Sequence, residues 1–230
     1  DTLVKEDLAQ LFDWDLQGNP VAAVRDYGVE RAALKSDERR CYHQDKVHGR
    51  QVCDYFNSGV FLMDLAQFRR RRLGEQAIQR ICDDPGLNFP DQDALNLVID
   101  GEVTYLPERW NVMTLEREAA VHPALPTGFR ARLQAAFNDP AIIHYVYHKP
   151  WSPFPVHLRR EFLRVARQTP WKQVRFSTRE LDWRQKRALL RAWKRQFVKV
   201  RIRKDEVALH VWGRPMVHWA RPMGTEQRAA

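Results

Sequence analysis

Short apolar runs alternate with helix-like stretches along most of the chain. Apolar or β-branched runs that are bounded by turn residues are typical of buried strands. This pattern predicts strands at residues 1–4, 21–24, 60–63, 103–106 and 142–145. Apolar residues that recur every three or four positions predict helices at residues 8–12, 64–83, 91–99, 157–168 and 178–199. Strands and helices that alternate in this way indicate an α/β fold.

The stretch 54–64 (DYFNSGVFLMD) joins a polar entry, an apolar run and the start of a helix. Asn57, Ser58 and Gly59 precede the apolar run, and a glycine lets the backbone approach another group closely. We expect the four apolar residues that follow to be core and Asp64 to cap the next helix. Two interpretations stay open here, a turn that feeds a core strand and the edge of a binding site.

The segment 29–53, which lies just before this stretch, is polar, charged and only weakly periodic. It predicts a mobile loop or a broken helix. Long insertions of this kind often cover a functional site.

The composition is that of a globular protein, with 44% hydrophobic and 11% aromatic residues in 230. The apolar runs are far too short to cross a bilayer, and no signal-peptide pattern is visible. The chain opens at Asp1, inside a predicted strand, so we expect a fragment of a longer protein. Cys41, Cys53 and Cys82 match no metal or redox spacing, which favours a reduced, cytosolic setting.

The net charge of +9 is unevenly distributed. Residues 1–158 carry 18 Lys and Arg against 23 Asp and Glu, a net charge of −5, whereas residues 159–205 carry 17 against 4, a net charge of +13. We therefore predict an acidic body at residues 1–156 and a basic, mostly helical extension at residues 157–230. Such an extension suits an anionic surface, either lipid headgroups or nucleic acid. A helix docked on the body, with its long basic side chains covering it, is the other interpretation.

Five polar residues lie at or beside the ends of predicted strands: Asp1, Asp26, Asn57, Asp91 and His144. In open α/β sheets, ligands bind at that edge. Carboxylates and an imidazole there are suitable ligands for Mn²⁺ or Mg²⁺. Lys149 follows closely and offers a positive charge for a phosphate. The pattern predicts a metal–diphosphate site, although each residue alone also has a structural explanation, such as a core histidine or a helix cap.

Five motifs in a fixed order carry a resemblance to a known family: DTLVKEDLAQLFDWDL, YFNSGVFLMDL, DQDALN, LPERWN and HY…KPW. This order resembles glycosyltransferase family 8, in particular its bacterial lipopolysaccharide glucosyl- and galactosyltransferases, over about residues 1–175. The resemblance implies a GT-A fold, which is Rossmann-like, with its N-terminal part missing. It also implies a retaining hexosyltransferase that uses a UDP-hexose donor, a saccharide or glycolipid acceptor, and Mn²⁺ or Mg²⁺.

The resemblance also implies roles for single residues on the metal side. Asp1 matches the second aspartate of the family's Asp-x-Asp motif, a metal ligand, and His144 matches the histidine that completes that site. Lys149 matches a lysine that contacts the donor diphosphate. The segment HYVYHKPW is one residue shorter than the family pattern and has Tyr147 where the family has glycine.

On the sugar side, the resemblance places Asn57, Ser58 and Gly59 at the donor sugar. Asp91 matches a residue that binds sugar hydroxyls, and Gln92 matches a residue near the anomeric carbon. Asp26 aligns with an aspartate of the sugar site. Because an amide is a poor nucleophile, we expect front-face attack by the acceptor hydroxyl rather than a double displacement through Gln92.

Two other functions stay open at this point. The basic extension could belong to a membrane- or nucleic-acid-binding protein with a degenerate, inactive transferase body. Of these two partners, we expect an anionic membrane surface, bound through residues 159–205, on the inner face of a membrane. A self-glucosylating enzyme of the same family would need an acceptor tyrosine, and none is singled out. A chain that begins inside the Asp-x-Asp motif is expected to be inactive alone.

Overall fold

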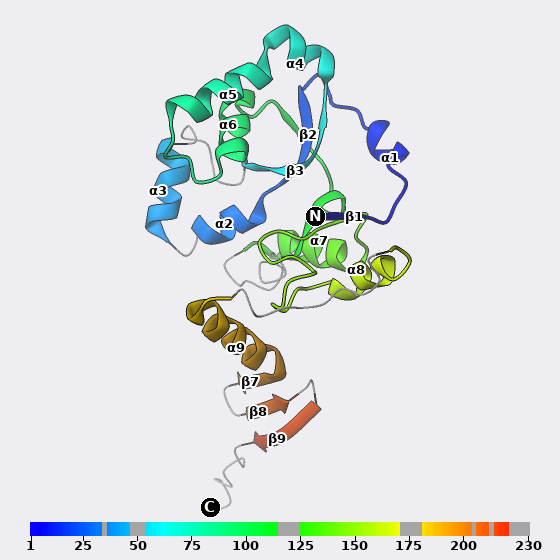
Figure 1. The fold of residues 1–230 in the computed structure, drawn as a ribbon, viewed down its shortest axis with the longest axis vertical. Coiled ribbons are helices and arrows are strands. Elements are labelled where there is room, and N and C mark those ends of the chain that lie inside the picture. The colour runs from blue at the N-terminus through cyan, green and yellow to red at the C-terminus, as the bar shows by residue number, and fades with distance from the viewer. Residues whose placement is uncertain are drawn as a thin grey trace, which may run out of the picture. The chain divides into compact units, whose positions relative to one another are not determined.

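The structure is a computed structural model that describes residues 1–33, 36–46, 54–114, 125–170, 181–203, 206–211 and 214–220. The chain divides into two compact units, Asp1–Tyr147 and His148–Ala230. Figure 1 shows the course of the chain through both.

The described residues form nine strands: β1 (Thr2–Val4), β2 (Val21–Arg25), β3 (Phe56–Met63), β4 (Val103–Tyr105), β5 (Val112–Met113), β6 (Ile142–His144), β7 (Val198–Arg203), β8 (Glu206–Val211) and β9 (Arg214–Ala220). They make three sheets of three strands, in the orders β1-β6-β5, β3-β2-β4 and β7-β8-β9. The first two sheets each combine one antiparallel and one parallel pair, whereas the third is antiparallel throughout.

The described helices are α1 (Ala9–Phe12), α2 (Tyr27–Ala33), α3 (Asp37–Lys46), α4 (Leu65–Arg71), α5 (Leu73–Asp83), α6 (Pro90–Ile99), the 3₁₀ helix η2 (Glu108–Asn111), α7 (Thr127–Asn138), α8 (Arg159–Ala166) and α9 (Trp183–Phe197). The broken helix predicted within 29–53 is confirmed where this segment is described, by the end of α2 and by α3. Residues 47–53 lie outside the described residues.

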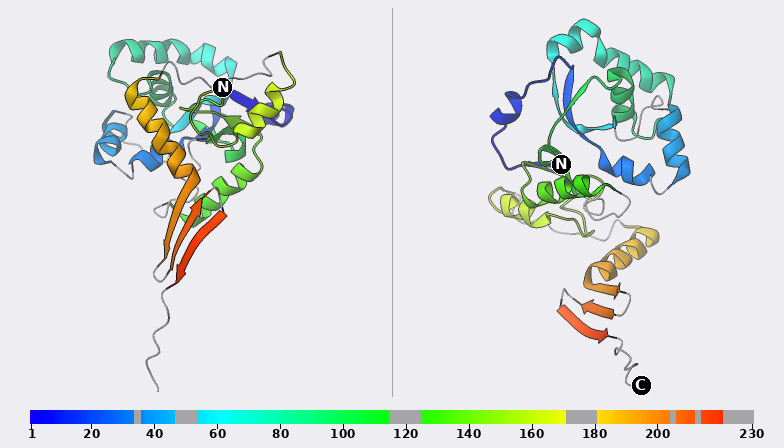
Figure 2. Two further views of the ribbon diagram at one scale, coloured as in Figure 1. Left: turned by 60° about the horizontal axis from the view of Figure 1, so that its bottom comes forward. Right: turned by 180° about the vertical axis from the view of Figure 1, so that it is seen from behind.

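Strand β2 forms the centre of the β3-β2-β4 sheet, and every residue from Val21 to Val24 is buried. Helix α6 lies alongside β3 (Figure 2). The core that joins this sheet to α4, α5 and α6 is made of Val21, Ala23, Phe56, Phe68, Leu73, Ile99 and Val103. An unbroken apolar run is what a strand needs when both of its faces are covered.

The long helix predicted at 64–83 is wrong in one respect, because the structure breaks it at Arg72. That residue adopts a left-handed conformation with φ of 53°, and its backbone N–H donates to the carbonyls of Phe68 and Arg69. The start of the helix is as predicted, since the side chain of Asp64 accepts a hydrogen bond from Gln67 N at 3.0 Å. This contact holds the pKa of the Asp64 carboxyl below its usual range.

Strand β3 begins four residues earlier than predicted and includes the polar Asn57, Ser58 and Gly59. The expectation that all four residues of 60–63 are core is wrong, since Leu62 is buried but the Met63 side chain is 39% exposed. Alternate side chains of a strand point to opposite faces, which explains why neighbours differ.

The second unit contains α8, α9 and the sheet β7-β8-β9, whose strands lie side by side in Figure 2. Both helices were predicted, but the sequence indicated only one strand-like piece after residue 206. Leu189 is the buried residue of the described part of α9, whereas Trp183 and Leu190 are 66% and 63% exposed. Within the described part of the chain, none of the helices combines the length and the apolar character that a bilayer crossing requires.

Candidate functional site

The side-chain amide of Asn57, at the start of β3, is the centre of a buried hydrogen-bond network. Its Nδ2 donates to Asp26 Oδ2 at 3.0 Å and to Gln92 Oε1 at 2.9 Å. Its Oδ1 accepts from Gly59 N at 3.0 Å and from Asn111 Nδ2 at 2.9 Å. An asparagine amide offers two donors and two acceptor lone pairs, so all four are used within the protein. Asn57 therefore holds the residues around it in fixed positions through these four hydrogen bonds.

Asp26 and Gln92 close one side of this network. Gln92 Nε2 donates to Asp26 Oδ2 at 2.9 Å, and Ser58 N donates to Gln92 Oε1 at 3.0 Å. Asp26 also caps α2, because its Oδ1 accepts from Val29 N at 3.1 Å. Both side chains are buried, with 9% and 7% of their surface exposed. These hydrogen bonds fix the orientation of the side-chain amides of Asn57 and Gln92.

Asp91 differs from these residues because it is exposed at the start of α6. Its Oδ2 accepts a hydrogen bond from Ser58 Oγ at 3.3 Å. A carboxylate at a helix N-terminus is favoured by the helix dipole. Asp91 is therefore placed to contact a ligand from solvent.

His144 lies at the end of β6 and is buried, with 8% exposed surface. Its Nδ1 is 3.1 Å from Asn111 Oδ1, which connects it to the Asn57 network. Its Nε2 is 3.5 Å from Asp1 Oδ1, since β1 pairs with β6 and Thr2 lies opposite His144. Gly59 lies against the Cε1 edge of the ring. A Cβ at position 59 would come 2.2 Å from His144 Cε1, so only glycine fits there.

The predicted metal ligands Asp1 and His144 thus lie side by side. Two ligands of one octahedral ion at about 2.1 Å each are roughly 3 Å apart, so the observed spacing is compatible with a shared cation. The second nitrogen of a metal-binding histidine normally contacts an oxygen, and Asn111 Oδ1 provides that contact. Among the described residues, no group of three or more His, Cys, Asp or Glu side chains is arranged to hold a metal. The described chain therefore offers two donors of such a site.

Comparison with known proteins identifies the family. The model of "Glycosyl transferase family 8" matches residues 1–153, which is more than half of the chain. The chain belongs to glycosyl transferase family 8. It is 30% identical over 179 residues to general stress protein A of Bacillus subtilis, covering 76% of this chain and 58% of that protein. It is 27% identical over 176 residues to a lipopolysaccharide 1,2-glucosyltransferase of Escherichia coli, covering 75% and 48%.

Solved structures show the same fold. The bifunctional glycosyltransferase WbbM has a TM-score of 0.66 and 28% identity, over 74% of this chain and 32% of that one. The galactosyltransferase LgtC, solved with donor and acceptor sugar analogues, has a TM-score of 0.51 and 28% identity, over 66% and 52%. The predicted α/β GT-A fold is confirmed. This family 8 chain spans about half the length of the curated relatives that it matches.

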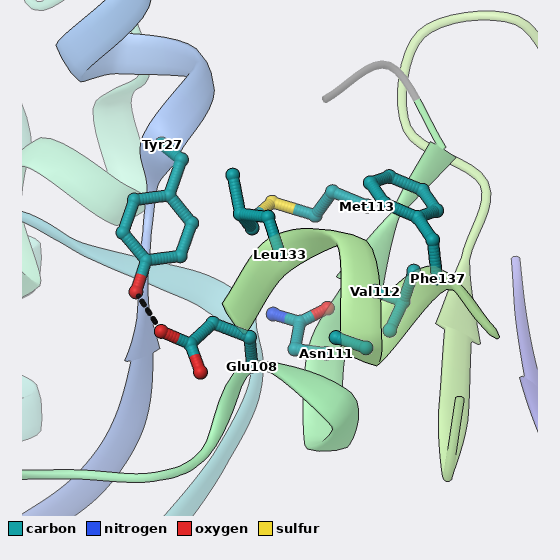
Figure 3. A pocket seen from close by; sticks show the side chains of 8 residues that line it. Tyr27, Glu108, Asn111, Val112, Met113, Leu133 and Phe137 are labelled. Carbon is teal, nitrogen blue, oxygen red and sulfur yellow. Dashed lines mark hydrogen bonds between the residues drawn. The ribbon is translucent and has the colours of Figure 1, made fainter. Parts of the chain in front are cut away.

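The 3₁₀ helix η2, which ends at Asn111, is held firmly in this family 8 chain. Glu108 Oε1 accepts hydrogen bonds from Tyr27 Oη at 2.8 Å and from Arg132 Nε at 2.9 Å. Figure 3 shows the first contact beside a small pocket lined by Tyr27, by Glu108 and Asn111 of η2, and by apolar side chains of β5 and α7. The contact with Glu108 raises the pKa of Arg132. These contacts fix the position from which Asn111 reaches His144.

Asp93, the third residue of the DQD motif, has a structural role. It is fully buried and accepts hydrogen bonds from Tyr42 Oη at 2.6 Å, Tyr55 Oη at 2.5 Å and Phe89 N at 2.9 Å. Burial, together with Asp93, raises the pKa of Tyr42 to about 12 and raises the pKa of Tyr55 further. The two phenols therefore stay protonated and act as donors that tie α3 and the start of β3 to α6.

Lys149 belongs to the second unit, where its carbonyl accepts a hydrogen bond from Ser152 N at 2.9 Å. Tyr147 ends the first unit. Its φ of 63° lies in the left-handed region, and its side chain is 75% exposed. The backbone therefore adopts the conformation that favours glycine, although a tyrosine stands there. A bulky residue in this region is uncommon.

Asn111 is the site residue that the sequence interpretation missed. It is 2% exposed and joins His144 to Asn57, whereas the sequence interpretation had assigned it no role. A signal was present, since a polar residue directly before a short buried strand has to find a partner in the interior. Asn96 was noted in the DQDALN motif, and it binds both backbone groups of Phe56 at 2.9 and 3.0 Å.

Proposed function

We propose that the protein is a retaining glycosyltransferase that transfers a hexose from a UDP-sugar to a saccharide or glycolipid acceptor, with the assistance of Mn²⁺ or Mg²⁺. The observation that carries this proposal is the continuous network from Asp26 and Gln92 through Asn57 and Asn111 to His144. It joins the predicted sugar side to the predicted metal side in a chain of family 8. The lipopolysaccharide glucosyltransferases among its relatives support a role in lipopolysaccharide or other cell-surface glycan synthesis.

In this proposal, Asp1 and His144 hold the divalent cation. Such an ion neutralises the charge that develops on the departing nucleoside diphosphate, which is the main requirement of this reaction. Lys149 is proposed to add a further positive charge against the diphosphate.

The geometry of Gln92 favours front-face transfer over a double displacement. Both lone pairs of its Oε1 are used, by Asn57 Nδ2 and Ser58 N, so this oxygen has none left for attack on the anomeric carbon. The acceptor hydroxyl then attacks on the same face that the phosphate leaves, and its proton passes to a phosphate oxygen. Asp91 is exposed and orients sugar hydroxyls in this scheme.

The exposed surface of α9 supports a place at the inner face of a membrane, in the cytoplasm. Trp183 and Leu190 are exposed among Arg184, Lys186 and Arg187. Amphipathic helices with basic and aromatic residues bind anionic lipid surfaces. This same surface also favours the second candidate, a membrane-binding protein whose transferase body is inactive.

Donor turnover separates the two candidates. The complete protein that contains this chain is mixed with a UDP-hexose, and release of UDP is followed with Mn²⁺, with Mg²⁺ and with excess chelator. The proposed function predicts turnover that either ion supports and that the chelator abolishes. An inactive body predicts no release of UDP under any of these conditions. We expect the 230-residue chain alone to be inactive in the same assay.

A further inference from the structure

Hydrogen bonds connect Asp26, Asn57, Asn111 and His144 in a chain. Only one assignment of donors and acceptors satisfies all of these bonds. We infer that this chain fixes neutral His144 as the tautomer with its proton on Nδ1, so that the lone pair of Nε2 faces Asp1. Asn57 and Asn111 are positioning residues in this scheme. The use of that lone pair for a cation rests on the proposed function, whereas the tautomer itself does not.

The direction is set at Asp26, whose two carboxylate oxygens receive three donors. Val29 N donates to Oδ1, and Asn57 Nδ2 and Gln92 Nε2 both donate to Oδ2. Asn57 must therefore present its nitrogen to Asp26. The opposite end of the same amide gives an independent indication, because Gly59 N donates to Asn57 Oδ1 at 3.0 Å. A backbone N–H cannot be reversed, so the orientation of Asn57 is determined twice.

The orientation of Asn111 follows from that of Asn57. Since Asn57 Oδ1 is an acceptor, the atom of Asn111 that lies 2.9 Å away must be the donor Nδ2. Asn111 Oδ1 then faces His144 Nδ1 at 3.1 Å. A reversed Asn111 would bring two oxygens together at a site where only 2% of its surface is exposed, so water could not relieve the repulsion.

The tautomer of His144 is the last step. Both ring nitrogens face an acceptor, but Asn111 is 2% exposed and its Oδ1 lies 3.1 Å from Nδ1, whereas the Asp1 side chain is 33% exposed and its Oδ1 lies 3.5 Å from Nε2. Asn111 Oδ1 only accepts hydrogen bonds and is shielded from water, so in the neutral ring the proton belongs on Nδ1. In the neutral ring, Nε2 then bears the lone pair and points toward Asp1 Oδ1 at 3.5 Å. The carboxylate of Asp26, on the predicted sugar side, thereby sets which nitrogen His144 offers on the predicted metal side.

Nitrogen-15 NMR of the imidazole rings tests this directly and needs neither metal nor substrate. Long-range ¹H–¹⁵N spectra of the full chain distinguish a protonated ring nitrogen from one with a lone pair. They are recorded about two pH units above the ordinary histidine pKa of about 6.5. His144 is assigned by the signals that His144→Gln removes. We expect its proton on Nδ1, and a His144 with its proton mainly on Nε2 would overturn the inference.

Two variants test the relay. Asn111→Ala removes the acceptor, and Asn57→Ala frees Asn111 to turn its amide, although Asn57 makes no hydrogen bond to His144. In both, the proton of His144 is expected to move toward Nε2. Thr104→Val removes a buried hydroxyl that bonds Leu16 and Asn19, and should leave His144 unchanged. A proton that stays on Nδ1 in Asn57→Ala would overturn the relay.

The same measurement separates this inference from the proposed function. Complete protein that turns over UDP-hexose only with Mn²⁺, in which His144 nevertheless carries its proton on Nε2, contradicts the inference alone. A proton on Nδ1 in a protein that turns over no donor supports the inference and contradicts the proposed function.

Discussion

Gly59 lies directly against the imidazole ring of His144, and a Cβ at position 59 would come 2.2 Å from His144 Cε1 and 2.9 Å from Nδ1. The Gly59→Ala variant must therefore displace His144 from Asp1. We expect a loss of about 1–3 kcal/mol in the free energy of unfolding, as for other overpacked sites. We also expect loss of metal-dependent donor turnover in the complete protein. Urea unfolding and the UDP-release assay measure the two effects.

Gly74→Ala is the matched control, because an added Cβ at that position has no atom within 4 Å. It lies in the first turn of α5, where alanine is the better helix former by up to about 1 kcal/mol. This variant is expected to be as stable as the wild type or more stable, with full turnover. Equal behaviour of the two alanine variants would contradict the close packing of Gly59 on His144.

Asp93 is predicted to stabilise the fold rather than to take part in catalysis. Asp93→Ala leaves the hydroxyls of Tyr42 and Tyr55 and the N–H of Phe89 without their acceptor. We expect a loss of roughly 2–4 kcal/mol in the free energy of unfolding, because unsatisfied buried donors are costly. The exposed Asp13 is the control, and Asp13→Ala should change stability by no more than about 0.5 kcal/mol. Similar unfolding midpoints for both variants would disprove this role.

The stability of the second unit is predicted to depend on the protonation of His148. Burial lowers the pKa of His148, and Arg159 lowers it further, while its ring stacks on Phe154 at 4.2 Å. The unfolded chain thus binds the proton more readily than the folded chain. The stabilisation is present above the ordinary histidine pKa and is lost as pH falls below it. Urea midpoints should therefore decrease between neutral and mildly acidic pH.

His148→Phe is the variant that checks this dependence, since it keeps an aromatic ring against Phe154 and cannot titrate. Its urea midpoint is expected to decrease less than that of the wild type over the same pH interval. If the two proteins lose stability in parallel, His148 is not the group responsible.

Helix α9 is predicted to bind anionic lipid. At low ionic strength, the chain should sediment with vesicles that contain phosphatidylserine but not with pure phosphatidylcholine, and added salt should release it. Trp183→Ser combined with Leu190→Ser should weaken sedimentation, because both side chains are exposed. Ile78→Ser removes an equally exposed apolar side chain from α5 and should have no effect. Absence of sedimentation in low salt would favour the interpretation of α9 as a docked helix.

Strands β1, β2, β4 and β6 and the family were predictable because they depend on local signals, whereas β5 and most of the sheet β7-β8-β9 were not predicted. The buried run Val21–Val24 is apolar throughout, and Asp64 caps its helix as its position indicated. The break at Arg72 was not predictable, because an arginine in the left-handed conformation has no local sequence signal.

The candidate site was predictable only in part, because contacts between residues far apart in the chain leave no local signal in the sequence. The resemblance selected Asp26, Asn57, Gln92 and His144, and the structure brings all four into one network. It did not select Asn111, which contributes through contacts with Asn57 and His144 that lie 54 and 33 positions away in the chain. Hydrogen-bond partners of this kind depend on tertiary packing, which periodicity and spacing do not encode.

The most direct test of the account is the metal-dependent turnover of UDP-hexose by the complete protein carrying His144→Ala. Loss of a metal ligand should reduce activity at least as much as loss of a residue that hydrogen-bonds to such a ligand. We therefore expect turnover with Mn²⁺ to fall by roughly 100-fold or more. Thr104→Val, buried away from the network, should retain wild-type turnover. Wild-type turnover by His144→Ala, or turnover that excess chelator leaves unchanged, would contradict the assignment of His144 to a catalytic metal.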